Sequence, residues 1–116
     1  MIKKNIIQDY NKNGVVVLRD IVPKKWINIL KRGLKKNFQN PSKYKCVYER
    51  NNEKELFYDD YCNWNKIEEY KNFIFQSNIG KLAQELMQSK KVNVFHEHVL
   101  VKEIGSTKRT PWHQDQ

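Results

Sequence analysis

The stretch VNVFHEHVLVKEIGSTKRTPWHQDQ, residues 92–116, decides how the rest of the chain is interpreted. It holds all three histidines of the protein. Residues 92–103 fit a period of two, which predicts a long strand with apolar residues on both faces. One face of this strand carries His96, His98, Leu100 and Lys102. Gly105 then breaks the strand, and Pro111 favours an extended conformation in the segment that follows.

The end of this stretch carries a His-x-Asp pair. In an extended segment, residues two apart point to the same side, so His113 and Asp115 present an imidazole and a carboxylate to one point. Such a pair supplies two of the three protein ligands of the 2-His-1-carboxylate triad, which leaves coordination positions open on a non-haem Fe(II). The pattern therefore indicates an iron site whose third ligand lies outside this stretch.

The other two histidines leave alternatives open. His96 and His98 could join His113 in a three-histidine zinc site that keeps a fourth position for water. Alternating with valine and leucine, they could instead face a partly polar cavity of a small β-barrel or jelly roll. A third interpretation makes them hydrogen-bonded residues of the core or its rim.

The first part of the chain predicts two helices with a strand between them. Apolar residues from Ile2 to Tyr10 recur at helical spacing, and Asn13-Gly14 supplies residues that close a helix in the left-handed conformation. Residues 15–18, VVVL, predict a buried strand. A second helix begins at Pro23 and ends at Asn40, with an apolar stripe made by Trp26, Ile29, Leu30, Leu34 and Phe38.

The middle of the chain is rich in aromatic residues and predicts shorter elements. Residues 44–48 and 56–58 are candidate strands on either side of a turn at residues 51–52, and the aromatic side chains are expected to pack together. Asn65 and Glu68 resemble a capping box that starts a third helix. Ser77 is expected to cap a fourth helix, and both helices are expected to pack against the long strand.

Length and composition limit the class of protein. The 116 residues make a single domain, and no apolar run is long enough to span a bilayer. The N-terminus lacks the apolar stretch of a signal peptide, so a cytoplasmic protein is expected. Cys46 and Cys62 have neither CxxC spacing nor the density of a disulfide scaffold, which predicts two free thiols.

The chain has a net charge of +9, and the excess of positive charge is found in the first 45 residues. These contain twelve lysines and arginines but only two acidic residues, Asp9 and Asp20. A small basic module that binds nucleic acid or another anion is therefore an alternative function. The acidic residues among the aromatics of residues 44–64 argue against stacked bases there, so nucleic acid is the less favoured partner.

Across nearly its full length the sequence resembles the N-terminal portion of the phytanoyl-CoA dioxygenase family of Fe(II)- and 2-oxoglutarate-dependent oxygenases. The resemblance runs through the segment from Asp9 to Arg19, the helix after Pro23 and the segment from Ile79 to Leu86. It is most specific in His96 to Glu103, Gly105 and Thr110-Pro111-Trp112-His113-Gln114-Asp115-Gln116.

The resemblance implies an α+β fold, in which N-terminal helices precede the first strands of a double-stranded β-helix, a jelly-roll or cupin-like fold. It implies that His113 and Asp115 are iron ligands and that His98 faces the cosubstrate 2-oxoglutarate. The enzyme would use O2 to hydroxylate a small metabolite or an acyl thioester. In the family, a second ligand histidine and a 2-oxoglutarate-binding arginine lie further downstream. The chain is therefore expected to be a truncated member that binds Fe(II) weakly and is inactive by itself.

Overall fold

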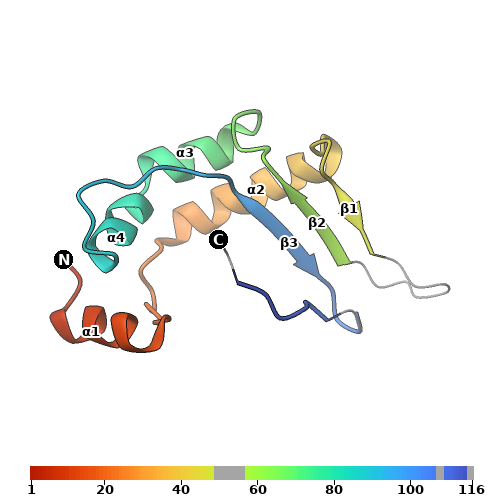
Figure 1. Cartoon of the computed structure of the whole chain (residues 1–116). Helices are drawn as coiled ribbons and strands as arrows, with labels where there is room; N and C mark the ends of the chain where they lie inside the picture. Colours follow the sequence, from red (N-terminus) through yellow and green to blue (C-terminus); the bar gives the residue numbers. More distant parts are fainter. Residues whose placement is uncertain (49–56, 107–108, 115–116) are drawn as a thin grey trace.

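Helices and a small antiparallel sheet make up an α+β fold (Figure 1). The computed structural model describes residues 1–48, 57–106 and 109–114. In these ranges the helices are α1 (Lys4–Asn13), α2 (Lys24–Gln39), α3 (Glu68–Gln76) and α4 (Ile79–Leu86). The strands are β1 (Cys46–Val47), β2 (Phe57–Tyr61) and β3 (His98–Lys102), and they lie in the order β1-β2-β3. The described residues do not form a double-stranded β-helix.

The two predicted N-terminal helices are confirmed. Helix α1 ends at Gly14, whose φ of 72° is the left-handed conformation expected there, and its N–H bonds to the carbonyl of Tyr10. Helix α2 follows Pro23 and packs against α3. At this contact the buried ring of Trp26 meets the edge of Phe73, with 5.9 Å between the ring centroids. The apolar stripe of α2 thus joins it to the following helical layer.

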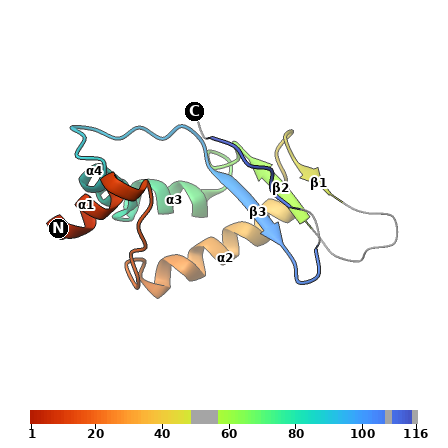
Figure 2. The same ribbon diagram turned by 60° about the horizontal axis from the view of Figure 1, so that its bottom comes forward.

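The sheet has one face against α2 and one open face. Strand β2 pairs with β3 in antiparallel register, with Tyr58 opposite Val101 and Asp60 opposite Val99. Side chains alternate along a strand, so these four residues share the face that α2 covers. Figures 1 and 2 together place α2 on one side of the sheet and the C-terminal segment on the other. That other side is the open face, and it carries His98.

Two strand predictions are wrong in part or in whole. Residues 15–18 form no strand, and Val15 and Val17 are 66% and 70% exposed. The predicted strand over residues 92–103 shortens to His98–Lys102, and Phe95 in the lost part is 86% exposed. A β-branched run becomes a strand only where another strand satisfies its backbone groups, and only residues 98–102 lie beside β2.

The predicted helix starts in the second half are partly right. Helix α3 has Ile67 at its N-cap position without a side-chain cap, so the capping box of Asn65 is wrong. Helix α4 has Asn78 at its N-cap position, although the Ser77 hydroxyl accepts a hydrogen bond from the N–H of Ile79 at 3.3 Å. The predicted turn at residues 51–52 lies outside the described residues.

The aromatic residues of the middle segment pack as expected. Their ring contacts are Tyr44 with Tyr61, Tyr48 with Phe57, Phe38 with Tyr58, and Trp64 with Phe75. Both cysteines are free thiols, as predicted. No helix in the described part of the chain has the length and apolar character needed to cross a membrane.

Candidate functional site

A buried carboxylate ties the sheet to α2. Asp60 of β2 is fully buried, and its carboxylate accepts hydrogen bonds from Asn37 Nδ2 at 2.7 Å and from the Tyr58 hydroxyl at 3.0 Å. It also accepts the backbone N–H and the hydroxyl of Ser42 at 3.0 and 2.5 Å, and the N–H of Tyr61 at 2.9 Å. A buried carboxylate with this many donors is stabilised in its ionised form. The network therefore fixes where β2 lies relative to the end of α2.

The network also shifts two ionisation equilibria. Burial raises the pKa of Asp60, but the hydrogen bonds from Ser42, Asn37 and Tyr58 outweigh burial and hold that pKa below its usual value of 3.8. Burial, with the hydrogen bond to the Asp60 carboxylate, raises the pKa of Tyr58 to about 12. At neutral pH the pair is a carboxylate and a neutral phenol.

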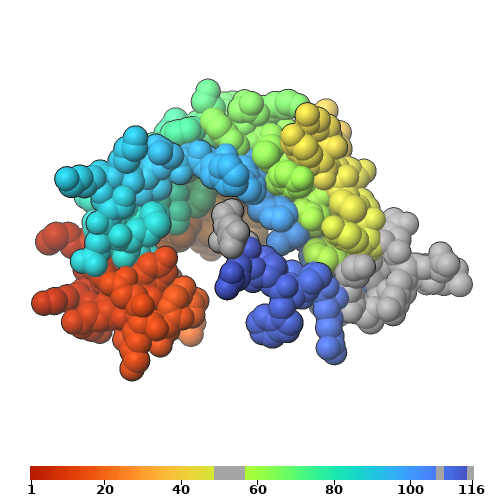
Figure 3. Space-filling view, viewed as in Figure 1, coloured from red at the N-terminus to blue at the C-terminus, as the bar shows by residue number. Residues whose placement is uncertain are grey.

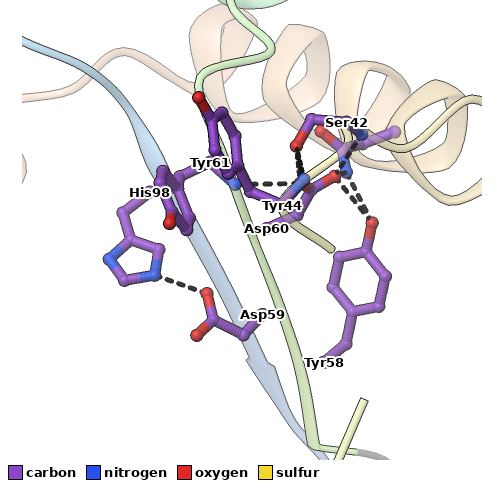
Figure 4. A network of polar contacts seen from close by, with 8 residues as sticks. Ser42, Tyr44, Tyr58, Asp59, Asp60, Tyr61 and His98 are labelled. Atoms are coloured by element: carbon purple, nitrogen blue, oxygen red, sulfur yellow. Dashed lines mark hydrogen bonds and ion pairs between the residues drawn. The ribbon is translucent and has the colours of Figure 1, made fainter. Parts of the chain in front are cut away.

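The open face of the sheet carries a carboxylate–imidazole pair. Asp59 Oδ1 lies 2.5 Å from Nε2 of His98, and Figure 4 shows the two side chains reaching toward each other across β2 and β3. The ring of Tyr61 meets His98 edge-on, with 5.5 Å between centroids. On the other side Tyr61 stacks on Tyr44 at 4.6 Å with the planes 13° apart. His98 is therefore held by a partner on each of two sides.

His96 stands close to this pair but is exposed. Its ring lies 4.6 Å from that of Phe95, 5.8 Å from that of Tyr61 and 6.3 Å from that of His98, measured between centroids. No three histidine, cysteine, aspartate or glutamate side chains of the described residues converge on a point that could hold a metal ion. All three histidines are among those residues, so this arrangement gives no support to a three-histidine zinc site.

A groove of about 800 Å³ borders His96. It runs between α4 and residues 92–97, and its walls are largely apolar, with Trp64, Phe75 and Val94 among them. Residues 92–97 are not part of β3, and the only backbone–backbone hydrogen bond between them and another described segment runs from the N–H of Cys62 to the carbonyl of Glu97 at 3.3 Å, so most of this stretch is left to border the groove. A space of this size and character suits a small, largely apolar molecule.

The C-terminal segment, which carries His113 in the sequence, passes on the open side of the sheet (Figures 1 and 2). After Gly105 the chain turns back and runs toward the beginning of β3 in both ribbon views (Figures 1 and 2). Figure 3 shows this dark blue segment in the mouth of an arch formed by the helices and the sheet. Trp112 is fully exposed in this segment. His113 is exposed, and its Nδ1 lies 2.8 Å from the carbonyl oxygen of Pro111. Asp115 lies outside the described residues.

The three histidines and the residues of the sequence motif are thus only partly brought together. His96 and His98 lie side by side near Tyr61, whereas His113 belongs to the separate C-terminal segment. Asp59 was missed, although Phe57, Asp59 and Tyr61 recur with the period of a strand. The register of β2 against β3 is the missing information, because it alone places an acid diagonally across from His98.

Comparison with known proteins connects this site to a family. No curated protein and no solved structure matches the chain. The family model for phytanoyl-CoA dioxygenase (PhyH) matches residues 10–116, a range that includes the open face, the groove and the histidine-bearing C-terminal segment. The match covers far more than half of the sequence. The chain belongs to the phytanoyl-CoA dioxygenase family.

Proposed function

We propose that the chain is part of an Fe(II)- and 2-oxoglutarate-dependent dioxygenase that hydroxylates a small metabolite or an acyl thioester. His113 and Asp115 would be the protein ligands of the iron, and His98 would contact the cosubstrate. Family membership supports an activity of the dioxygenase type. The residue roles rest on the motif that surrounds His113 and on the contacts of the histidine side chains.

The single observation that carries the proposal is the contact between His113 and Pro111. A carbonyl oxygen can only accept a hydrogen bond, so Nδ1 of His113 must donate at this distance of 2.8 Å. In the neutral ring the lone pair then lies on Nε2, the tautomer that suits a metal ligand. Metal-binding histidines regularly donate their other ring nitrogen to a carbonyl or carboxylate in this way. This contact supports the proposed role of His113 as a ligand.

The donor set also suits the metal. An imidazole and a carboxylate from a His-x-Asp segment are the ligand types of the facial triad, which leaves positions open for a cosubstrate and O2. When bound, Fe(II) together with 2-oxoglutarate and O2 supplies the oxidising power for hydroxylation of a C–H bond. The chain itself would hold the metal through His113 and Asp115, orient the cosubstrate from the open face of the sheet through His98, and shield the reaction with the apolar groove beside His96.

Paramagnetic NMR tests the proposal. Mn(II), used in place of Fe(II), should broaden the ring signals of His113 at concentrations that leave those of His96 sharp. His113→Ala should abolish the strongest Mn(II) binding, whereas His96→Ala, a matched change at another exposed histidine, should leave it intact. Equal broadening of all three histidines would contradict the assignment. Steeply salt-dependent binding to DNA or RNA, with no metal effect at His113, would favour the basic binding module instead.

A further inference from the structure

The Asp59–His98 pair has a geometry that fixes one ring nitrogen and leaves the other facing the open side. The two residues sit diagonally on neighbouring strands, because Asp59 lies opposite Leu100 and His98 lies opposite Tyr61. Their side chains approach to 2.5 Å, with the Asp59 side chain 18% exposed and the His98 side chain 44% exposed. This exposure admits a small ligand to the ring and leaves little of the carboxylate open to solvent.

The surroundings of the pair restrict its movement. The rings of Tyr61 and His98 meet edge to face. The ring of Tyr61 is itself held in place because it stacks on Tyr44. The next residue of β2, Asp60, points to the opposite face into the buried network with Ser42 (Figure 4). A strand anchored on one face holds the side chain next in sequence at a defined place on the other face. Asp59 therefore presents its carboxylate at a fixed point beside β3.

The chemistry of the pair assigns the two ring nitrogens. An aspartate carboxylate only accepts hydrogen bonds, so Nε2 of His98 is the donor in the contact. Nδ1 is then the ring atom that faces away from Asp59, and no hydrogen bond from it to another described residue is present. A protonated ring in this position donates through both nitrogens, with Nε2 serving Asp59 and Nδ1 serving a second carboxylate.

We propose that Asp59 is a positioning residue, which turns Nδ1 of His98 toward a carboxylate group of a small ligand on the open face of the sheet. The inference deepens the proposed function, on which it rests, because 2-oxoglutarate is a small dicarboxylate. Asp59 touches no ligand itself. It acts through His98, in the way that an acid orients the imidazole of a histidine in many active sites.

The test follows the ring nitrogens of His98 by ¹⁵N NMR in the metal-free chain, with 2-oxoglutarate as the probe. The unliganded protein should show Nε2 protonated, and added 2-oxoglutarate should shift the Nδ1 signal of His98. In Asp59→Ala, the proton of the neutral His98 ring should no longer favour Nε2 over Nδ1. The binding of 2-oxoglutarate should weaken about tenfold, the loss expected when an orienting charge-assisted hydrogen bond is removed. Asp59→Asn keeps an acceptor oxygen and should rescue part of both effects.

Two controls make the outcome decisive. Asp9→Asn removes one negative charge from an exposed position on α1 and should change neither the ring nitrogens nor the binding of the probe. Far-UV circular dichroism checks that each variant is folded, and Asp59→Asn carries the test if Asp59→Ala is not. An unchanged Nε2 state and unchanged 2-oxoglutarate binding in folded Asp59 variants would overturn the proposal.

Failure of this inference is distinguishable from failure of the proposed function. The Mn(II) experiment reads His113, and the 2-oxoglutarate titration reads His98 without metal. Loss of the Mn(II) effect with intact, Asp59-dependent carboxylate binding would remove the iron site and keep the positioning role. Intact Mn(II) binding, with no effect of the Asp59 variants on 2-oxoglutarate binding, would keep the iron site and remove the positioning role.

Discussion

Gly33 of α2 lies directly against the ring of Tyr70 of α3. A Cβ at position 33 would come within 2.7 Å of Tyr70 Cε1 and 2.9 Å of Cδ1, closer than real Cβ contacts. Both residues are buried, and Tyr70 is only 6% exposed. The close approach of α2 and α3 therefore depends on the absence of a side chain at this one position.

Gly33→Ala should lower the free energy of unfolding by about 1–2 kcal/mol. Alanine favours a helix by about 1 kcal/mol over glycine, but forcing a methyl group into a packed contact costs typically about 1–3 kcal/mol or more. Urea unfolding would measure the difference. Gly80→Ala is the matched control, because nothing lies within 4 Å of a Cβ there. It should leave stability unchanged or raise it by up to about 1 kcal/mol, and equal effects at both glycines would refute the steric account.

Asp60→Asn should destabilise the fold strongly. An amide at this position offers one acceptor oxygen and one donor group to neighbours that are mainly donors, so buried hydrogen bonds from Ser42, Asn37 or Tyr58 are lost. Breaking a buried, charge-assisted network costs about 2–5 kcal/mol. Asp59→Asn changes the neighbouring residue, whose partner is half exposed, and should cost less than about 1 kcal/mol. Comparable urea midpoints for the two variants would contradict the role of Asp60.

The Asp60 network should also set how the fold responds to acid. The pKa of Asp60 is lower in the folded chain than its usual value of 3.8, so the carboxylate stabilises the fold fully above that value. This contribution is lost as the pH falls through the lowered native pKa. The gap in urea midpoint between the wild-type chain and Asp60→Asn should hence shrink below about pH 4. A gap that stays constant down to pH 2 would show that the charge on Asp60 is not responsible.

Ionisation of Tyr58 should lower the stability of the fold at alkaline pH. Its pKa is raised from 10.0 to about 12 in the folded chain, so the neutral phenol contributes stability that is fully present below pH 10. That contribution declines as the pH rises from 10 to about 12. Tyr58→Phe has no ionisable phenol and should lose less stability than the wild-type chain over this range. Parallel pH profiles of the two proteins, followed by thermal unfolding, would rule out this explanation.

The 116-residue chain should bind Fe(II) weakly and should not convert 2-oxoglutarate to succinate. Among the residues that the structure describes, no set of three histidine, cysteine, aspartate or glutamate side chains could hold a metal ion, which agrees with weak binding. The measurement is succinate release in the presence of Fe(II), ascorbate, O2 and 2-oxoglutarate. Succinate in amounts stoichiometric with the protein would contradict the prediction.

Local signals in the sequence predict the helices better than the strands. Gly14 ends α1 because a left-handed residue is needed there, and this requirement is readable from one position. The VVVL run and residues 92–97 have the composition of strands but no neighbouring strand in the described structure. Strand formation depends on a partner distant in the sequence, and composition does not reveal that partner.

The candidate site could be predicted only where it is local in sequence. His113 and Asp115 are two residues apart, so spacing alone proposes them as a ligand pair, and this stays a prediction because Asp115 lies outside the described residues. The Asp59–His98 pair joins residues 39 positions apart and needs the register of β2 against β3. The buried Asp60 network was also missed, because polar residues such as Asn37 are expected at the surface unless their partners are known.

The positions of the tryptophans give the protein a built-in optical readout. Trp26 is 8% exposed between α2 and α3, whereas the indole of Trp112 is fully in solvent one residue before His113. Buried indoles emit at shorter wavelengths than hydrated ones, so, with the half-buried Trp64 replaced by phenylalanine, the short-wavelength fluorescence reports on the helical layer and the long-wavelength fluorescence reports on the C-terminal segment. A quenching metal ion held by His113 would dim the long-wavelength component first. Folding and metal binding can therefore be followed separately in one unlabelled sample of the Trp64→Phe variant.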